Sequence, residues 1–344
     1  MTANTSPSGR SVRRARSTRS PRIAVAAEPR FIAGASLRSR ILAESIRFTV
    51  KPALEVWARW PSPLWPAGAL DLAARIVPPG RGVGRRRIRL EHCGAEWLQA
   101  RDAMRDAVVL YLHGGGFLTC GLNTHRNLVS RISGAAGVPV LAVDYRMLPK
   151  HPIDAAIADG VAGYRWLLEQ GFEGKRIVIA GDSAGGYLTF ATAIAIAELG
   201  LPTPAGLVAL SPLTDIDPST KLAHPAADGC PLIPRSVLLA LADVAAARAG
   251  ANSRTSPVNG VLAGLPPVLI HVGSTEILYP DAELMAQRLG AAGVSVTLEV
   301  WDRQVHVFHA AAGLIPEAER AIARVGEFIR TCTPAAEAPA LTAV

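Results

Sequence analysis

Six residues constrain this chain more than any others: Gly181-Asp182-Ser183-Ala184-Gly185-Gly186. The residues just before them, 176–180, are mostly β-branched or apolar and predict a strand, whereas residues 187–197 have the composition of a helix. Ser183 is therefore expected in a tight turn between a strand and a helix, where small neighbours tolerate a strained backbone and the helix presents its positive end. A bare G-x-S-x-G pattern arises by chance about 0.15 times in a chain of this composition, so the rest of the chain must decide its meaning.

The segments on either side of this turn alternate between strands and helices. Strands are expected at 107–112, 138–145, 176–180, 206–210, 267–272 and 294–300, and helices at 123–136, 153–170, 187–197, 282–291 and 316–330. An antiparallel pair at 87–92 and 96–101 precedes them. This alternation predicts an α/β fold over residues 81–331, with a mostly parallel central sheet and helices on both of its faces. Residues 213–250 break the rhythm with several prolines and one expected helix, 235–249, and are interpreted as an insertion at the carboxyl edge of the sheet.

The net charge of the chain, +8, is concentrated at its N-terminus. Residues 1–40 hold nine arginines and one acidic residue, whereas the other 304 residues balance 27 basic against 27 acidic side chains. Because the first 25 residues have almost nothing apolar, residues 1–36 are expected to form a disordered basic arm, and residues 332–344 a disordered tail. A nucleic-acid partner is not favoured for the neutral body, but weak binding of the arm to nucleic acid or to a membrane surface stays open.

The compartment is inferred from the cysteines and from the absence of targeting signals. Cys93, Cys120, Cys230 and Cys332 follow no C-x-x-C or metal-ligand spacing, which favours free thiols in the cytoplasm. Arg13-Arg14 resembles a twin-arginine export signal, but the apolar run after it is too short, so export is the less favoured alternative. No apolar run is long enough to predict a transmembrane helix.

Residues 37–80 carry apolar side chains at helical spacing, interrupted by prolines. Trp57, Trp60 and Trp65 lie in this segment. They could pack against the body of the protein or form part of a lid over a binding site, and the sequence alone leaves both interpretations open.

Acyl transfer through a serine requires a base, a carboxylate that orients the base, and amides that stabilise the oxyanion. Ser183 is the expected nucleophile. His306 is favoured as the base because it follows the last strand closely, with His309 as the alternative. Glu276 is favoured as the acid because it lies in the loop after strand 267–272. Asp281, the alternative acid, stands at a helix start where a carboxylate has an ordinary stabilising role. The order Ser183, Glu276, His306 is typical of α/β-hydrolases.

The glycine run His113-Gly114-Gly115-Gly116 follows a strand and leaves room for a substrate carbonyl oxygen, so it is the expected oxyanion loop together with the amide of Ala184. No G-K-[ST] follows the run, which argues against a phosphate-binding loop. The chain also lacks H-E-x-x-H. We therefore expect no metal and no organic cofactor.

Several of these motifs together resemble the hormone-sensitive lipase family of serine esterases, especially its small bacterial esterases and acetyl-hydrolases. They are H-G-G-G-F at 113–117, D-Y-R at 144–146, G-D-S-A-G-G at 181–186 and W-D-x-x-x-H at 301–306. The resemblance covers residues 40 to 331 and implies an α/β-hydrolase fold. It also implies a nucleophile at Ser183, a base at His306, oxyanion amides at Gly115, Gly116 and Ala184, and Glu276 where the family has an aspartate.

The same resemblance implies a cap over the site, built by residues 40–80 and 213–250. We name Trp57, Trp60 and Trp65 of this cap and Phe117 of the glycine loop as candidate substrate contacts. Asp144 and Arg146 are expected to have structural roles. The implied activity is hydrolysis of short- to medium-chain acyl esters through an acyl-enzyme, with a small-molecule ester as the partner. Two alternatives stay open: an acetyl-hydrolase acting on a small metabolite amide, and a non-catalytic ligand-binding protein on the same fold. The sequence fixes neither the physiological ester nor the oligomeric state.

Overall fold

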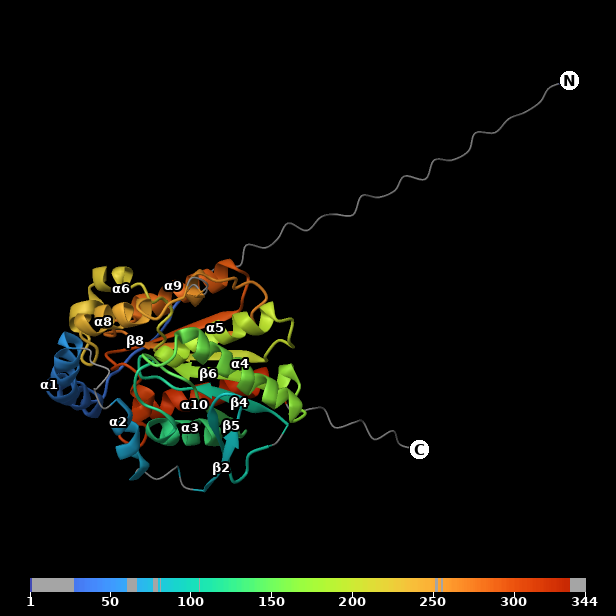
Figure 1. The fold of residues 1–344 in the computed structure, drawn as a ribbon, viewed down its shortest axis with the longest axis horizontal. Coiled ribbons are helices and arrows are strands. Elements are labelled where there is room, and N and C mark those ends of the chain that lie inside the picture. The colour runs from blue at the N-terminus through green and yellow to red at the C-terminus, as the bar shows by residue number, and fades with distance from the viewer. Residues whose placement is uncertain are drawn as a thin grey trace.

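The computed structural model describes Met1 and residues 28–60, 67–76, 80, 82–104, 106–250, 253–254, 256 and 257–334. Within these residues a single nine-stranded sheet runs through the molecule in the order β1-β9-β8-β7-β6-β4-β5-β3-β2 (Figure 1). The strands are β1 (Arg30–Ile32), β2 (Val83–Arg89), β3 (Gly94–Ala100), β4 (Val108–Leu112), β5 (Val140–Asp144), β6 (Ile177–Asp182), β7 (Gly206–Leu210), β8 (Val268–Gly273) and β9 (Val296–Trp301). Only the pairs β2–β3 and β3–β5 are antiparallel, which confirms the mostly parallel sheet.

Helices cover both faces of this sheet, so its central strands are buried on both sides. Val108, Leu110 and Leu112 of β4 pack into the apolar cluster of α4 (Ile153–Glu169), α5 (Ala184–Glu198) and α9 (Tyr279–Ala291). Val109 and Tyr111 of the same strand pack into the opposite cluster, with α3 (Leu122–Ala136) and α10 (Pro316–Cys332). The alternation of side chains along one strand therefore serves two cores, as the predicted α/β fold requires.

The remaining helices belong to the N-terminal segment and to the predicted insertion. They are α1 (Leu37–Arg59), α2 (Ala67–Ala73), α6 (Ser219–Ala223), α7 (Ala226–Gly229) and α8 (Arg235–Ala246), with the short 3-10 turns η1 (Ala74–Ile76), η2 (Gly174–Arg176), η3 (Pro257–Asn259) and η4 (Phe308–Ala311). None of the helices in the described part of the chain is both long enough and apolar enough to cross a membrane.

Helix α1 packs against α8, so the two segments are neighbours although some 180 residues separate them (Figure 1). Lys51 Nζ of α1 donates to the carbonyl oxygen of Cys230 (2.9 Å), and Arg47 donates to that of Gly229 (3.4 Å). At its other end α1 is fixed to the loop after β9, because the Ser39 hydroxyl donates to Gln304 Oε1 (2.8 Å) in a buried contact. Helix α1 therefore lies at the carboxyl edge of the sheet.

The prediction of a disordered arm over residues 1–36 is wrong at its C-terminal end. Residues Arg30–Ile32 form the edge strand β1 and pair in parallel with Glu299–Trp301 of β9. The pairing uses backbone groups, and the amide of Ser36 is held by a carboxylate oxygen of Glu317 (2.7 Å), so no apolar run is needed to order this segment. Residues 2–27 lie outside the described residues. At the other terminus α10 reaches Cys332, one residue into the predicted tail, and residues 335–344 lie outside the described residues.

Candidate active site

Ser183 occupies the turn between β6 and α5, as expected from the sequence. Its backbone has φ 54° and ψ −119°, a conformation that residues other than glycine adopt only under strain. The amide of Ser183 donates to Leu210 O (2.9 Å) of the neighbouring strand, which fixes the turn. A Cβ atom at Gly185 would collide with the carbonyl oxygen of Leu112, so this position of the motif needs glycine for space. Ser183 itself is partly exposed, whereas Asp182 and Ala184 are buried.

The three residues predicted for nucleophile, base and acid lie in one chain of contacts. His306 Nε2 is 2.9 Å from Ser183 Oγ, and His306 Nδ1 is 2.7 Å from Glu276 Oε2. They come from three different strand ends: Ser183 after β6, Glu276 after β8 and His306 after β9. The parallel sheet brings these ends to one edge, which is where catalytic groups of such folds gather.

The carboxylate of Glu276 is completely buried, and both of its oxygens have hydrogen-bond partners. Its Oε1 accepts hydrogen bonds from the Gly273 amide (2.6 Å) and from the Ser211 hydroxyl (2.7 Å), which leaves Oε2 for His306. The Ser211 hydroxyl also accepts the amide of Val307 (3.1 Å), next to His306. These contacts fix both the carboxylate and the loop that carries the imidazole.

Neither Asp281, the alternative acid, nor His309, the alternative base, takes part in this chain of contacts. Asp281 accepts the amides of Thr214 (2.7 Å) and Asp215 (3.1 Å), and its other oxygen pairs with the buried ammonium of Lys221 at 3.0 Å. Asp281 therefore ties the start of the insertion to α9.

His309 lies on a separate buried contact, with Nε2 3.1 Å from His271 Nδ1. Burial, together with the neighbouring imidazole of His271, lowers the pKa of His309 well below its usual value, so this side chain is neutral at pH 7.

The glycine loop after β4 has the backbone needed for an oxyanion site. Gly115 has φ +117°, and a Cβ atom there would collide with the carbonyl oxygen of Thr119. In the part of the chain that the structure describes, the amides of Gly115 and Gly116 donate to no backbone carbonyl oxygen. Ala184 begins α5, so its amide is one of those that a helix leaves without an intrahelical partner. The three amides are therefore free to donate hydrogen bonds to a ligand oxygen.

Asp182, which the sequence analysis did not single out, holds this glycine loop against the turn. Its Oδ1 accepts the Tyr111 hydroxyl (2.7 Å) and the Gly114 amide (3.1 Å), and its Oδ2 lies 3.2 Å from His125 Nε2. Burial opposes ionisation of this carboxyl, but the His125 charge and hydrogen bond and the Tyr111 hydroxyl outweigh it and lower the pKa of Asp182 to about 2. In the sequence, the position of Asp182 directly before Ser183 in the G-x-S-x-G motif was the signal that could have indicated this role.

Two further residues, Tyr145 and Arg146, support the same region. The Tyr145 hydroxyl donates to His113 O (2.7 Å), and its ring stacks on the His113 imidazole at 4.2 Å between centroids. Arg146, the next residue, forms an ion pair with the buried Asp159 (2.8 Å). These contacts give Tyr145 and Arg146 of the D-Y-R motif structural roles.

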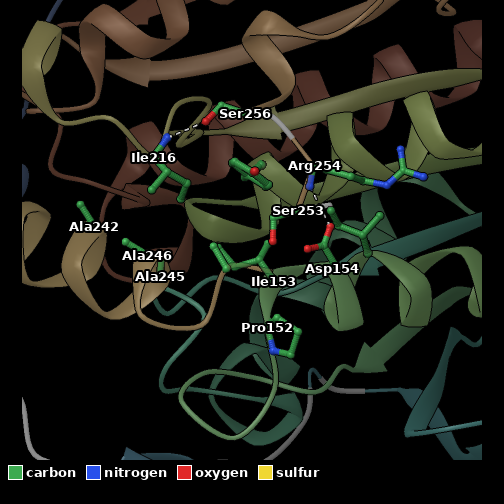
Figure 2. A pocket seen from close by; sticks show the side chains of 13 residues that line it. Pro152, Ile153, Asp154, Ile216, Ala242, Ala245, Ala246, Ser253, Arg254 and Ser256 are labelled. Carbon is green, nitrogen blue, oxygen red and sulfur yellow. Dashed lines mark hydrogen bonds between the residues drawn. The ribbon is translucent and has the colours of Figure 1, made fainter. Parts of the chain in front are cut away.

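A cavity of about 160 Å³ lies between the start of α4, α8 and the segment around Ser256 (Figure 2). Its walls are mostly apolar, with Ile153, Ile216 and Ala242 among them, and Asp154 and Arg254 supply charge (Figure 2). Tyr187, four residues after Ser183, also lines it, whereas Ser183 and His306 do not. The cavity therefore adjoins α5, the helix that begins directly after Ser183.

The aromatic residues predicted as candidate substrate contacts have different surroundings. Trp57 is half-buried and Trp60 is exposed, and neither lines the cavity. Trp65 lies outside the described residues. Phe117 is buried and meets the Tyr187 ring edge-on at 5.4 Å, so it supports a wall of the cavity from behind. Among the described residues no group of three or more histidine, cysteine, aspartate or glutamate side chains is arranged to hold a metal ion.

Comparison with known proteins identifies the family. A family profile described as "alpha/beta hydrolase fold" matches residues 109–310. The chain belongs to the α/β-hydrolase fold family. It is 43% identical to the Mycobacterium tuberculosis protein named "Esterase LipU" over 296 residues, which cover 83% of this chain and 99% of that protein. It is also 43% identical to an "Acetyl-hydrolase" of Streptomyces hygroscopicus over 265 residues, which cover 75% of this chain and 84% of that protein.

Among solved structures, this α/β-hydrolase is similar to an esterase described as a member of the bacterial hormone-sensitive lipase family. The TM-score is 0.77 at 35% sequence identity, and the match covers 88% of this chain and 100% of that one. The resemblance stated from the sequence motifs is therefore confirmed, as is the fold class.

Proposed function

We propose that this α/β-hydrolase is a serine carboxylic-ester hydrolase in which Ser183, His306 and Glu276 are nucleophile, base and orienting acid. The observation that carries this proposal is the unbroken contact from Ser183 Oγ to His306 Nε2 (2.9 Å) and from His306 Nδ1 to Glu276 Oε2 (2.7 Å). The same contacts disfavour a non-catalytic ligand-binding protein, because binding alone does not require an imidazole poised between a hydroxyl and a buried carboxylate.

The chemistry follows from these positions. His306 Nε2 takes the proton of Ser183 as its oxygen attacks the ester carbonyl, and the buried Glu276 carboxylate stabilises the imidazolium and holds Nδ1 protonated. The amides of Gly115, Gly116 and Ala184 donate to the oxyanion of the tetrahedral intermediate. His306 then gives its proton to the leaving alcohol, which leaves an acyl group on Ser183. Water, deprotonated by the same imidazole, releases the carboxylic acid.

We propose that α1 and the 213–250 segment form the cap over this site, and that the cavity beside Tyr187 receives part of the substrate. The packing of α1 on α8 and the attachment of α1 to the loop of His306 support this arrangement. The mostly apolar wall of the cavity, about 160 Å³ in volume, suits a short or medium acyl chain. The cytoplasmic location expected from the sequence stays a prediction.

One alternative substrate class has specific support, because a 43% identical relative is named an acetyl-hydrolase. Removal of an acetyl group from an amide uses the same steps, with an amine as the leaving group instead of an alcohol. Comparing p-nitrophenyl acetate with p-nitroacetanilide separates the two, since both release a chromophore and share the acyl group. A faster reaction with the ester favours the esterase, and a faster reaction with the anilide favours the amidase.

The direct test is hydrolysis of p-nitrophenyl butyrate by the purified protein and its Ser183→Ala variant. We expect the variant to lose activity by about 10³-fold or more, because the residual rate comes from substrate binding and the oxyanion amides alone. A variant that keeps near-normal activity would exclude Ser183 as the nucleophile.

A further inference from the structure

His125, near the start of α3, has an acceptor beside each of its ring nitrogens. Its side chain is only 12% exposed. Nε2 lies 3.2 Å from Asp182 Oδ2, and Nδ1 lies 3.3 Å from the carbonyl oxygen of Gly121 and 3.0 Å from the Thr124 hydroxyl. A carboxylate and a carbonyl oxygen can only accept hydrogen bonds. Both nitrogens of His125 therefore have a partner when both carry a proton, as in the imidazolium ion.

The Thr124 hydroxyl is the neighbour of Nδ1 that has a proton of its own. Its oxygen also lies 2.9 Å from the carbonyl oxygen of Gly121 and 3.2 Å from Asp71 Oδ1. A hydroxyl has one proton, and these two atoms can only accept it. When the proton goes to either of them, the Thr124 oxygen is left to accept a hydrogen bond from Nδ1. This arrangement agrees with a protonated Nδ1 on His125.

The charges around His125 also favour the imidazolium. Asp182 of β6 and Asp71 of α2 are the carboxylates that act on it. Burial opposes a charge on His125, but the Asp182 carboxylate and the Gly121 carbonyl outweigh it and raise the pKa of His125 above its usual value. The ring of His113, 5.4 Å away between centroids, stays neutral, because burial and the His125 charge lower the pKa of His113 to about 4.

The hydroxyl and thiol groups of this cluster keep their protons at neutral and moderately alkaline pH. Burial raises the pKa of Tyr111, which donates to Asp182, and that of Tyr145 well above their usual values. Burial also raises the pKa of the Cys120 thiol to about 11. Of these groups, only His125 is expected to change its charge between about pH 5 and about pH 10.

The proton on Nε2 decides which acceptor the Gly114 amide uses. That amide lies 3.1 Å from Asp182 Oδ1 and 3.3 Å from His125 Nε2. A protonated Nε2 cannot accept, so the Gly114 amide donates to Asp182, and Nε2 holds the other oxygen of the same carboxylate. His113 Nδ1 is 2.7 Å from the carbonyl oxygen of Gly114, in the peptide group that carries the amide of Gly115. The position of a proposed oxyanion amide therefore depends on how Gly114 is held.

We propose that His125 is a positioning residue that acts as an imidazolium, holding Asp182 and through it the oxyanion loop, and that its deprotonation lowers kcat. Loss of either proton sets a lone pair against an acceptor, which is Asp182 Oδ2 for Nε2 and the Gly121 carbonyl for Nδ1. A bare Nε2 also competes for the Gly114 amide. Because the oxyanion amides act on the transition state, the effect falls on kcat more than on KM. This effect rests on the proposed esterase activity, whereas the charge of His125 is measured without catalysis.

The charge is measured by NMR on full-length protein that is isotope-labelled at its histidine ring nitrogens, with the His125 signals assigned by their loss in His125→Gln. We expect both ring nitrogens to be protonated at pH 7 and to titrate above the ordinary value of about 6.5. Asp182→Asn removes the opposing charge and should move this titration down by at least about one pH unit. A bare ring nitrogen on His125 at pH 7 would overturn the proposal, whether or not the protein hydrolyses esters.

The positioning role is measured as kcat for p-nitrophenyl butyrate between about pH 5 and about pH 10. Wild-type kcat should fall by about tenfold on the alkaline side, at the pH where NMR shows His125 losing its proton. His125→Gln keeps a donor for Asp182 but cannot titrate. We expect it to have about tenfold lower kcat at pH 7, KM within about twofold of wild type, and no alkaline fall.

The matched control is His92→Gln, which replaces an exposed histidine between β2 and β3 and should keep the wild-type profile. Thermal unfolding checks that each variant is folded. A wild-type kcat that stays constant through the His125 titration would overturn the positioning role, as would an alkaline fall of the same size and pH in His125→Gln. A protein without any esterase activity would refute the proposed function instead, and the NMR titration would still decide the charge of His125.

Discussion

Replacing Glu276 with glutamine changes one atom of a buried carboxylate and tests the proposed acid most sharply. Glu276 Oε1 accepts the amide of Gly273, a donor that has no alternative orientation. A glutamine at this position must therefore direct its carbonyl oxygen toward Gly273 and its NH₂ group toward His306. Since an NH₂ group only donates, it selects the imidazole tautomer with a bare Nδ1 and a protonated Nε2. That tautomer cannot accept the proton of Ser183.

The size of the effect follows from the loss of the reactive tautomer and of the charge that stabilises the imidazolium. An amide in place of the orienting carboxylate of a serine triad lowers kcat by about 10⁴, which corresponds to about 5.5 kcal/mol of transition-state stabilisation. The fold should be less affected, because the glutamine keeps an acceptor for Gly273, and the Ser211 hydroxyl can still donate to it. We expect a large fall in kcat with little change in the free energy of unfolding.

Asp281→Asn is the matched control and should show the opposite pattern. Asp281 pairs with Lys221, and both side chains are almost completely buried, so the asparagine leaves a buried ammonium without its counter-charge. The free energy of unfolding should fall by about 3 kcal/mol. Activity should fall by less than about tenfold, because Asp281 makes no contact with His306.

The assay pairs kcat for p-nitrophenyl butyrate at pH 8 with urea unfolding of the same preparations. The tautomer argument would be refuted if Glu276→Gln kept more than about a tenth of the wild-type kcat while Asp281→Asn lost most of its kcat. The acid would then be reassigned to Asp281.

Three further predictions concern the oxyanion amides, the cavity and Asp182. Ala184→Pro removes one proposed oxyanion amide and should lower kcat by about 10²-fold, whereas Ala184→Gly, which keeps the donor, should lower it far less; thermal unfolding checks that both variants are folded. Ala242→Leu narrows the cavity and should raise KM for p-nitrophenyl octanoate several-fold without changing KM for the acetate, as a chain-length series would measure. Because the pKa of Asp182 is lowered to about 2, the ionised carboxylate stabilises the fold above about pH 4, and this stabilisation is lost as the pH falls toward 2. Urea unfolding across this range should show the free energy of unfolding fall by about 2 kcal/mol. The Asp182→Asn variant should lack this decrease.

The regular elements were predictable because each has a local cause. The strands β4, β6 and β7 are short, mostly apolar runs, with Asp182 at the end of β6, and the helices between them have their own periodicity. The turn at Ser183 was predictable because a close approach of two backbone segments requires glycine, and glycine can be seen in the sequence. Gly185, which lies against Leu112, is an example. The placement of Glu276 and His306 after successive strands followed from the topology alone, since parallel strands end at one edge.

The features that sequence reasoning missed depend on contacts between distant parts of the chain. Strand β1 is three residues long and is ordered by the backbone of β9, so its own side chains give no signal. The roles of Asp182 and His125 require knowing that β6 and the start of α3 meet at the glycine loop. Asp71 of α2 accepts the amides of Asn123 and Thr124 (2.9 Å each) and so caps α3 from a segment some 50 residues away, which no local capping pattern could indicate.

The central claim is that Ser183 carries the acyl group, and covalent labelling tests it most directly. The protein is treated with diethyl p-nitrophenyl phosphate, a reagent that transfers a phosphoryl group to an activated serine and releases p-nitrophenol. Intact-mass analysis followed by peptide mapping should find one diethylphosphoryl group, located on Ser183, with labelling much slower in Glu276→Gln because the base is no longer oriented. A label on another residue, or equal labelling of the Ser183→Ala protein, would contradict the account.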